Sequence, residues 1–348
     1  MNENKVKSAL IAMSGGVDST VAAVLMKQSG YECSGAIMKL FDGGNKTVEE
    51  ARTVSKQLGI PFYEFDFIEQ FSEKVINPFI SDYQQGRTPN PCVSCNKHLK
   101  FGVFMDKAID MGIDCIVTGH YVQTELDANG RYLLKKGTDL SKDQSYVLYS
   151  LTQKQLARSY FPLGKLTKPE VREIAIQSGL NNANKGESQD ICFIPDGDYM
   201  NFIIKFTGCT PQKGRFIDAD GNYLGESKGI SSYTIGQRRG LGLSMPHPPY
   251  VIELRPSDNT VVIGKEDMLY SKALTAKNIN LIPCDKLPAP IKMNVKIRYA
   301  DPGHLATVTQ TDDDTLLIEF DEPQRAITKG QAAVIYDGDI IIGGGTIT

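Results

Sequence analysis

The sequence has no long hydrophobic run. The apolar stretch Ala9–Met13 ends at a pair of glycines. It is far shorter than the ~20 residues that a membrane-spanning helix needs, and too short for the core of a secretory signal with its cleavage site. The 7 cysteines are an odd number in a chain of 348 residues, which argues against a disulfide scaffold and for a reducing compartment. We therefore expect a cytoplasmic protein, with no membrane segment, in which some thiols have a chemical role.

An excess of positive charge is also lacking. The formal net charge of -3 argues against a protein that simply coats nucleic acid, because lysine and arginine must neutralise the phosphates there. Three windows nevertheless contain basic residues and no acid, namely Tyr83–Met105, Ser227–Ile252 and Lys286–Ala300. They could form one track for an anionic polymer if the fold brings them together. Taken singly, each such window is more often a solvated face.

Two widespread nucleotide-binding motifs are missing. Neither G-x-x-x-x-G-K-[ST] nor G-x-G-x-x-G follows the first apolar run, where Ser14-Gly15-Gly16-Val17-Asp18-Ser19 stands instead. Its glycines permit positive φ and a close approach of the backbone to a ligand, so that successive N–H groups can converge on an anion. Asp18 or Ser19 is expected to cap a helix over Thr20–Gln28, whose first-turn amides add positive potential. An ordinary glycine-rich turn between a strand and a helix is the alternative.

The first ~200 residues alternate short apolar runs with amphipathic segments, which predicts an α/β domain with a parallel sheet covered on both faces. The expected strands are Ser8–Met13, Cys33–Met38, Phe62–Phe65 and Cys115–Thr118, and the expected helices are Asp18–Ser29, Val48–Leu58 and Asn96–Met111. A capping box at Thr167 opens a further helix to about Ser178. Ligands of such sheets bind at the carboxyl ends of the strands, where Ser14–Ser19 and Thr118–Tyr121 lie.

After about residue 205 the sequence contains many glycines and short alternating strands. We expect a small β-rich domain with tight turns, in which the segments of the sheet are Lys213–Phe216, Asp220–Tyr223, Tyr233–Gly242, Tyr250–Leu254 and Val261–Gly264. The segment Ile291–Thr348 is expected to close into an antiparallel β-barrel, because closure removes exposed strand edges. The expected domain boundaries are residues 1–204, 205–272 and 273–348. No internal repeat or low-complexity tract is present in the sequence.

Two segments that contain cysteine suggest sulfur chemistry. Arg87–Lys97 has two prolines ahead of Cys92 and Cys95. Cys95 is expected at the start of the helix that begins near Asn96, where the helix terminus and Lys97 lower the pKa of a thiol. Cys192 is expected in a strand-like part of the segment Gly186–Ile194. The other thiols are expected to be inert, either in buried strands or in loops without a nearby base: Cys33, Cys115, Cys209 and Cys284.

Several segments together resemble the bacterial tRNA-specific 2-thiouridylases, a family of the ATP pyrophosphatase (PP-loop) superfamily. The resemblance runs over essentially the whole chain and rests on Ser14–Ser19, Gly86–Phe101, Thr118–Tyr121, Lys142–Tyr146, Glu187–Ile194 and Tyr233–Gly240. It implies a PP-loop N-terminal domain, a small β-rich central domain and a C-terminal barrel that contacts tRNA. It also implies ATP-dependent 2-thiolation of the wobble uridine 34 in the tRNAs for Lys, Glu and Gln, with adenylation of O2, release of pyrophosphate and replacement of the activated oxygen by sulfur.

The resemblance further implies roles for individual residues. Cys192 would carry a persulfide from an upstream donor protein, and Cys95 would be the catalytic thiol. Cys95 would either direct the persulfide sulfur to C2 or reduce it to hydrosulfide, leaving a Cys95–Cys192 disulfide. Mg²⁺ is expected on the triphosphate. ATP would be held by Ala12, Met13, Ser14, Gly15, Gly16, Val17, Asp18, Ser19, Met38 and Gly119. The target base or the rest of the tRNA would contact Asn90, Pro91, Cys92, His120, Lys142, Asp143, Gln144, Arg298, Tyr299 and Gln331.

One position departs from the family pattern, since many relatives carry aspartate where this chain has Cys92. An acid there could act as a general base, whereas a thiolate is a better ligand for soft metals. Cys92, Cys95 and Cys192 could therefore hold a [4Fe–4S] cluster with one open iron for hydrosulfide. A zinc site that adds His98 is a further alternative. The number of thiols does not choose between a persulfide relay and a cluster.

Two other functions stay open at this point. A PP-loop ligase or amidotransferase would add nitrogen and would need neither Cys95 nor Cys192. A tRNA-binding or metal-binding module gated by a nucleotide would hold ATP without releasing pyrophosphate.

A thiolase, in contrast, would need its target uridine flipped out of the anticodon loop, because O2 is not reachable while the base is stacked.

Overall fold

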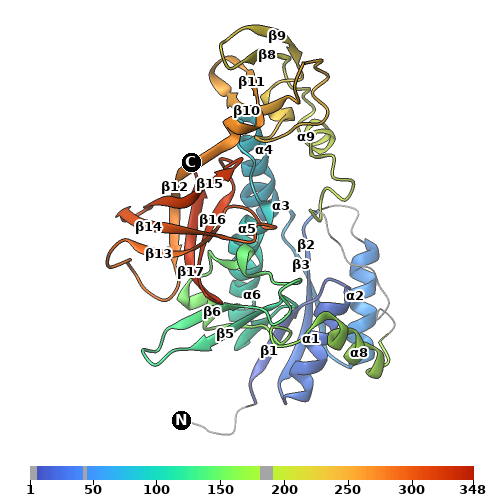
Figure 1. Ribbon diagram of the computed structural model, residues 1–348. Helices are drawn as coiled ribbons and strands as arrows, with labels where there is room; N and C mark the ends of the chain where they lie inside the picture. Colours follow the sequence, from blue (N-terminus) through green and yellow to red (C-terminus); the bar gives the residue numbers. More distant parts are fainter. Residues whose placement is uncertain (1–5, 42–44, 181–190) are drawn as a thin grey trace. The chain divides into compact units, whose positions relative to one another are not determined.

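The computed structural model describes residues 6–41, 45–180 and 191–348, and Figure 1 shows the path of the chain. The chain divides into two compact units. Unit 1 comprises residues 1–75, 92–189 and 338–342, and unit 2 comprises residues 76–91, 190–337 and 343–348. Within the described residues, no helix is both long enough and apolar enough to cross a membrane.

A parallel sheet of five strands forms the centre of unit 1, in the order β3-β2-β1-β4-β7. Its strands are β1 (Ser8–Ala12), β2 (Glu32–Lys39), β3 (Phe62–Asp66), β4 (Cys115–Val117) and β7 (Ser159–Tyr160). The four strands predicted from the sequence are confirmed to within one residue at each end. Strand β7 was not predicted, because a strand of two residues shows no periodicity.

Helices α1 (Val17–Gln28) and α2 (Asn45–Leu58) pack on one face of this sheet (Figure 1). Their small and branched residues interlock with Ile11 of β1 in one cluster, which contains Ala22, Ala23, Met26, Ala51 and Val54. Cys33 and Cys115 belong to the same cluster, each 5% exposed, so their predicted role as core residues is confirmed. Because β1 and α1 contribute to the same cluster, their packing fixes the position of the loop that joins them.

Helix α8 (Lys168–Gln177) packs beside α1, with Val171 against Val17 and Val21. The predicted capping box is confirmed, because Glu170 accepts a 2.6 Å hydrogen bond from the backbone N–H of Thr167. The helix therefore begins at Lys168, one residue after its cap. This start places the lysine on the side of α8 nearest to α1.

The remaining elements of unit 1 are short. They are α3 (Ile68–Phe71), a π-helical segment (Ser72–Ile76), α5 (Pro91–Cys95), a second π-helical segment (Asn96–Val103), α6 (Phe104–Asp110), a 3-10 turn (Ser145–Leu148) and α7 (Gln153–Leu156). Strands β5 (Val122–Leu126) and β6 (Tyr132–Lys136) form a hairpin around Asn129-Gly130, a pair that favours such turns. Ile340 and Ile341 of β17 (Ile340–Ile347) extend this hairpin by pairing with β6.

Unit 2 contains a four-stranded sheet in the order β10-β11-β8-β9. Its strands are β8 (Gly214–Asp218), β9 (Tyr223–Ser227), β10 (Tyr250–Arg255) and β11 (Thr260–Gly264). The predicted strand Tyr233–Gly242 is wrong, because this segment forms no strand and belongs to a loop. Gly236 N–H donates to Val251 O of β10 at 2.8 Å, and Val251 N–H donates to Gln237 O at 3.0 Å. The φ values of Gly236, Gly240 and Gly242 are 84°, 76° and 69°, which suit turns and not the extended backbone of a strand.

The predicted antiparallel barrel is confirmed in unit 2, and six strands form it in the order β12-β15-β14-β13-β16-β17. They are β12 (Tyr270–Leu281), β13 (Ile291–Lys296), β14 (His304–Asp312), β15 (Thr315–Arg325), β16 (Ala332–Asp337) and the later part of β17. Pairing of Ala276 with Ile347 closes the ring. The first barrel strand precedes the stretch in which barrel strands were predicted.

Unit 2 also contains two helices that carry aromatic side chains, α4 (Asn77–Gln84) and α9 (Tyr199–Thr207). The rings of Tyr83 and Tyr199 are stacked with centroids 4.3 Å apart. Phe79 meets Phe193 at 5.6 Å and Phe202 at 6.4 Å. These contacts fix the segment around residue 193 on the two helices.

Candidate functional site

The loop between β1 and α1 has the geometry of an anion site. Gly15 has φ of +67°, and Gly16, with φ of -89°, is the N-cap residue. The helix begins at Val17, so the prediction that Asp18 or Ser19 caps it is wrong; both lie in the first turn. The first hydrogen bond within the helix runs from Thr20 N–H to Gly16 O at 3.3 Å. The amides of residues 17–19 therefore have no acceptor within the helix and form its positive end.

Hydroxyl groups hold this loop in shape. Ser19 Oγ accepts a hydrogen bond from the N–H of Ser14 at 3.1 Å and donates to Gly16 O at 3.1 Å. Thr20 Oγ1 also donates to Gly16 O, at 2.9 Å. At the other side of the loop, Met13 N–H donates to Ala36 O of β2 at 2.8 Å. These hydrogen bonds fix the course of the loop backbone.

Two glycines allow the loop to pack closely. A Cβ added to Gly15 would lie 3.1 Å from Glu50 Cβ and 3.3 Å from Thr47 O. A Cβ on Gly119 would lie 2.8 Å from the carbonyl carbon of Asp18 and 2.9 Å from Ser19 N, so that no side chain fits there. The structure therefore brings Gly119 and Ser14–Ser19, predicted to serve the same ligand, into direct contact.

The carboxylate of Asp18 has two partners that sequence analysis missed. Tyr121 donates its hydroxyl to Asp18 Oδ1 at 2.7 Å, and Lys168 Nζ lies 2.6 Å from the same oxygen. Lys168 is 6% exposed, and its Nζ lies 5.7 Å from the centroid of the Tyr121 ring. The only signal in the sequence was the capping box at Thr167, which places Lys168 at the first position of the helix. Nothing in the spacing linked it to a residue 150 positions earlier.

His120 lies in the interior of unit 1. It is 6% exposed, its Nδ1 is 2.8 Å from Thr118 Oγ1, and its ring lies 6.0 Å from Phe101 and 6.4 Å from Phe161. Burial, aided by the charge of Lys100, holds its pKa well below the usual range. The imidazole is therefore neutral at pH 7, and its contact with tRNA stays a prediction.

Two of the predicted tRNA-contacting residues at positions 142–144, Asp143 and Gln144, make hydrogen bonds to nearby backbone. Gln144 Oε1 accepts a hydrogen bond from Tyr121 N–H at 3.0 Å, and Gln144 N–H donates to Tyr121 O at 3.2 Å. Asp143 accepts from the backbone and hydroxyl of Ser145 at 3.1 and 2.7 Å. Lys142 lines a pocket described below. These bonds fix the backbone beside Tyr121, which is itself bound to Asp18.

Cys95 does not begin a helix, which corrects the sequence prediction. Helix α5 starts at Pro91, and Cys95 is its last residue before the π-helical segment continues. Proline at the first helical position explains the earlier start, because its fixed φ suits that position and its missing N–H is not needed there. Cys92, not Cys95, therefore lies in the first turn. The residue as a whole is exposed, and desolvation by the surrounding protein raises the pKa of its thiol, while Lys100 opposes this shift.

Cys192 lies in a turn and not in a strand, which corrects a second prediction. Ile194 N–H donates to Ile191 O at 2.8 Å, and Ile194 is 2% exposed. Phe193 is fixed by the aromatic rings of α4 and α9, so the exposed Cys192 is presented between anchored neighbours. The earlier part of its motif, residues 186–190, includes positions outside the described residues.

Within unit 2, the segment that precedes α5 is bound to the barrel. Gln331 Nε2 donates to Thr88 O at 2.7 Å, and Thr88 N–H donates to Lys329 O at 2.8 Å. Gln331 therefore supports the chain that leads to Asn90 and Pro91. Arg298 and Tyr299 are exposed in a turn between β13 and β14, in which Asp301 N–H donates to Arg298 O at 3.1 Å.

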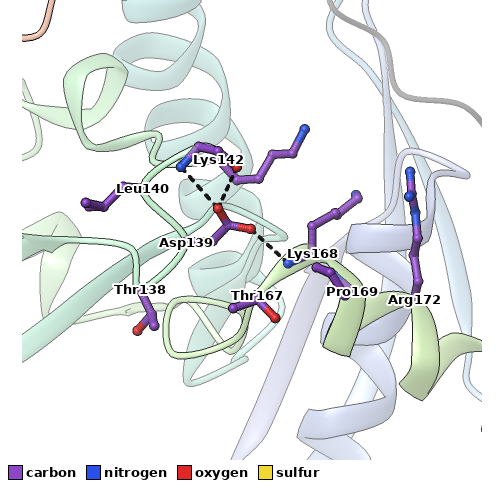
Figure 2. Close-up of a pocket in the computed structure, with 9 residues that line it drawn as sticks. Thr138, Asp139, Leu140, Lys142, Thr167, Lys168, Pro169 and Arg172 are labelled. Carbon is purple, nitrogen blue, oxygen red and sulfur yellow. Dashed lines mark hydrogen bonds between the residues drawn. The ribbon is translucent and has the colours of Figure 1, made fainter.

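An open pocket of about 910 Å³ adjoins the start of α8. Figure 2 shows three cationic side chains that extend from its wall in one direction, those of Lys142, Lys168 and Arg172. Asp139 lies at its base, where its carboxylate accepts from Lys168 N–H at 3.0 Å and from the hydroxyl of Ser141 at 2.6 Å. Among the described residues, no three His, Cys, Asp or Glu side chains are arranged to hold a metal ion.

Sequence models of three domain families match the chain in succession. They are the tRNA methyl transferase HUP domain over residues 7–196, the tRNA methyl transferase PRC-barrel domain over 201–265 and the aminomethyltransferase beta-barrel domain over 271–347. A protein of Clostridioides difficile strain 630 named tRNA-specific 2-thiouridylase MnmA is 49% identical over 98% of both chains. A protein of the same name from Halothermothrix orenii is 46% identical over 97% of this chain and 98% of its own.

Solved structures are similar over part of the chain. The U34-tRNA thiolase NcsA from Methanococcus maripaludis with its [4Fe-4S] cluster aligns with a TM-score of 0.37 and 17% identity, covering 58% of this chain and 67% of its own. An NMN synthetase from Francisella tularensis aligns with a TM-score of 0.36 and 17% identity, covering 61% of this chain and 81% of its own.

Proposed function

The chain belongs to the family of tRNA-specific 2-thiouridylases, and we propose that its substrate is the wobble uridine 34 of the tRNAs for Lys, Glu and Gln. Close relatives of that name cover nearly its whole length. The protein is therefore a tRNA uridine 2-sulfurtransferase of the PP-loop type. The observation that carries the chemistry is the loop Ser14–Ser19 at the start of α1, against which Gly119 packs without room for a Cβ.

In the first step, uridine O2 attacks the α phosphorus of ATP. The O2–Pα bond forms, the bond from Pα to the bridging oxygen breaks, and pyrophosphate leaves with the electron pair while the proton on N3 passes to solvent. The first-turn amides of α1 support this step, because they meet the phosphates with fixed positive dipoles. Mg²⁺ would neutralise charge on the triphosphate, and Asp18 is the carboxylate of the loop that suits a hard cation.

In the second step, sulfur replaces the activated oxygen. Cys192 would receive a persulfide from a donor protein, and the thiol of Cys95 would attack its inner sulfur, giving the Cys95–Cys192 disulfide and hydrosulfide. Hydrosulfide then attacks C2, AMP leaves with the electron pair, and a cellular dithiol reduces the disulfide for the next cycle. The exposure of Cys192 in an anchored turn supports its role as the sulfur acceptor.

A cluster mechanism is the second candidate, and Cys92 is the observation that favours it. Three thiolates from Cys92, Cys95 and Cys192 fit the ligand number of a [4Fe–4S] cluster that keeps one open iron. The raised pKa of Cys92 also makes it a poor substitute for a carboxylate base near neutral pH, because the thiolate is scarce there.

The proposed organisation and location follow from the same family membership. We assign residues 1–204 to ATP binding and catalysis, 205–272 to a small β-rich domain and 273–348 to a barrel that contacts tRNA. Arg298 and Tyr299, exposed in one turn of that barrel, supply a cation and a stacking surface for RNA. The cytoplasm, where tRNA is modified and thiols stay reduced, is the proposed compartment.

The function is tested with purified protein, ATP, a sulfide source and a tRNA transcript for Lys. We expect pyrophosphate and 2-thiouridine to form in equal amounts, and neither to form with a transcript that carries cytidine at position 34. Pyrophosphate without 2-thiouridine would favour a ligase or amidotransferase, and the absence of both would favour a binding module.

Binding of tRNA should weaken steeply as the salt concentration rises. Lys142→Gln should reduce the slope of log affinity for tRNA against log salt concentration by about one, because it removes one phosphate contact.

Gly119→Ala should weaken ATP binding, because the new Cβ would lie 2.8 Å from the backbone of Asp18. Overpacking costs about 1–3 kcal/mol, which corresponds to roughly 5- to 150-fold in affinity if the phosphate loop takes up the shift. Equilibrium binding of a fluorescent ATP analogue measures this. Gly130→Ala, at a positive-φ glycine with open space around it, is the control and should lower thermal stability without changing ATP affinity. An unchanged affinity in Gly119→Ala would show that this residue does not shape the site.

A further inference from the structure

The phosphate loop contains no lysine, yet the fold brings one to it. The loop Ser14–Ser19 lacks the basic residue that accompanies the glycines of a P-loop. Lys168, from α8, places Nζ 2.6 Å from Asp18 Oδ1. Because only 6% of this lysine is exposed, its charge lies inside the protein at the loop, where an electrostatic contact is stronger than in water.

The surroundings of Lys168 hold it in this position. Its backbone N–H donates to Asp139 at 3.0 Å, its ammonium lies over the ring of Tyr121, and the hydroxyl of Tyr121 binds the same oxygen of Asp18. Packing of Val171 on Val17 and Val21 fixes α8 against α1. A long side chain with so many constraints loses little further entropy when it meets a ligand.

The pocket beside Lys168 continues the positive surface away from the loop. Arg172 lies one helical turn after Lys168, on the same face of α8, and both line the pocket of about 910 Å³ (Figure 2). Asp139 lies at the base of the pocket. Its carboxylate accepts hydrogen bonds from the hydroxyl of Ser141 and from Lys168 N–H, and these bonds hold the pKa of Asp139 below the usual range. Its negative charge is therefore partly satisfied by fixed donors.

We propose that Lys168 and Arg172 form the site for the β and γ phosphates of ATP and hold pyrophosphate as it leaves. This inference rests on the proposed function and adds the missing cation to it. When the Pα–O bond breaks, the electron pair stays on the departing oxygen, and the ammonium of Lys168 offsets the new charge without giving up a proton. A backbone phosphate of tRNA is the other source of the same chemistry, but an almost fully buried ammonium suits a small ligand bound at the loop.

The test measures the affinity of inorganic pyrophosphate and of AMP, together with the rate of pyrophosphate release. Lys168→Gln should weaken pyrophosphate binding at least ~10-fold and slow its formation by about 10²-fold, while the affinities for AMP and for tRNA stay within about twofold. Lys168→Arg keeps the charge and should retain most of the pyrophosphate affinity. Arg172→Gln, at an exposed position where folding is not at risk, should weaken pyrophosphate binding by several-fold.

Lys165→Gln is the matched control, because this lysine lies three residues earlier and is exposed; it should change none of these values. Wild-type pyrophosphate affinity in both Lys168→Gln and Arg172→Gln would overturn the inference while leaving the proposed function intact. A loss of tRNA affinity with unchanged pyrophosphate affinity would assign the site to the RNA backbone and would also overturn it. A wild-type protein that releases no pyrophosphate would contradict the proposed function itself, and the inference with it.

Discussion

Asp18→Ala should abolish pyrophosphate release, lowering its rate by about 10³-fold or more, while the protein still binds tRNA. Asp18 lies in the first turn of α1 and binds both Tyr121 and Lys168 through Oδ1. Removing it therefore takes away the carboxylate of the loop and also releases the cation that this carboxylate positions. A single preorganised electrostatic contact contributes about 10²–10³-fold in rate, so two linked losses exceed that range.

The measurement is single-turnover release of labelled pyrophosphate, with tRNA affinity determined in parallel. Asp106→Ala is the matched control, because Asp106 is also the acid in the first turn of a helix, α6, and no role in ATP binding is proposed for it. Leaving Lys168 without its carboxylate should also cost roughly 1–3 kcal/mol of stability, less than a fully buried pair because the Asp18 side chain is 35% exposed. A tRNA affinity that collapses together with the rate would contradict the separation of the two functions.

Cys95→Ser and Cys192→Ser should each eliminate 2-thiouridine formation and leave pyrophosphate release intact. A hydroxyl cannot carry a sulfane sulfur or form the disulfide that balances its reduction, so no residual route through these residues is expected. The product is quantified by mass spectrometry of digested tRNA, with a persulfide donor and a dithiol present. Cys209→Ser, which removes another exposed thiol, is the control and should retain full activity. Full thiolation by either of the first two variants would refute the sulfur-transfer mechanism.

The same assay separates the relay from the cluster through Cys92→Asp. In iron-free protein, the relay predicts that this variant stays active, because it needs no metal and an acid at this position can act as a general base. The cluster mechanism predicts no activity, since it needs iron and a thiolate ligand at this position. Iron content and the visible absorption of the anaerobically purified wild type provide a readout that does not depend on turnover.

The local features of unit 1 were predictable from the sequence, and its long-range contacts were not. Strands β1 to β4 and the capping box at Thr167 depend on nearby residues, through short apolar runs and a side chain that reaches three residues along the chain. The contact between Asp18 and Lys168 depends on how α8 packs against α1, and no local pattern encodes that. Tertiary packing is also the reason that residue 119 must be a glycine, because a Cβ there would meet the backbone of Asp18.

The wrong predictions have separate physical causes. The helix that contains Cys95 starts at Pro91 because proline suits the first helical position, whereas the predicted start was near Asn96. The segment Tyr233–Gly242 alternates like a strand, but its glycines take positive φ. Around Cys192, the apolar neighbours suggested a strand, and they instead anchor a turn through aromatic contacts with α4 and α9.

Strand β17 is synthesised last but pairs with β6, which is synthesised much earlier. Lys136, at the end of β6, donates its ammonium to the carbonyl of Gly338, 202 residues later, and Ile340 and Ile341 then pair with β6. As the ribosome makes the chain from its amino end, the outer side of the hairpin stays without its neighbour until that distant segment emerges. An open strand edge on a nascent chain is prone to pair with other chains, so the hairpin is exposed to misassembly until the last residues of the chain are made.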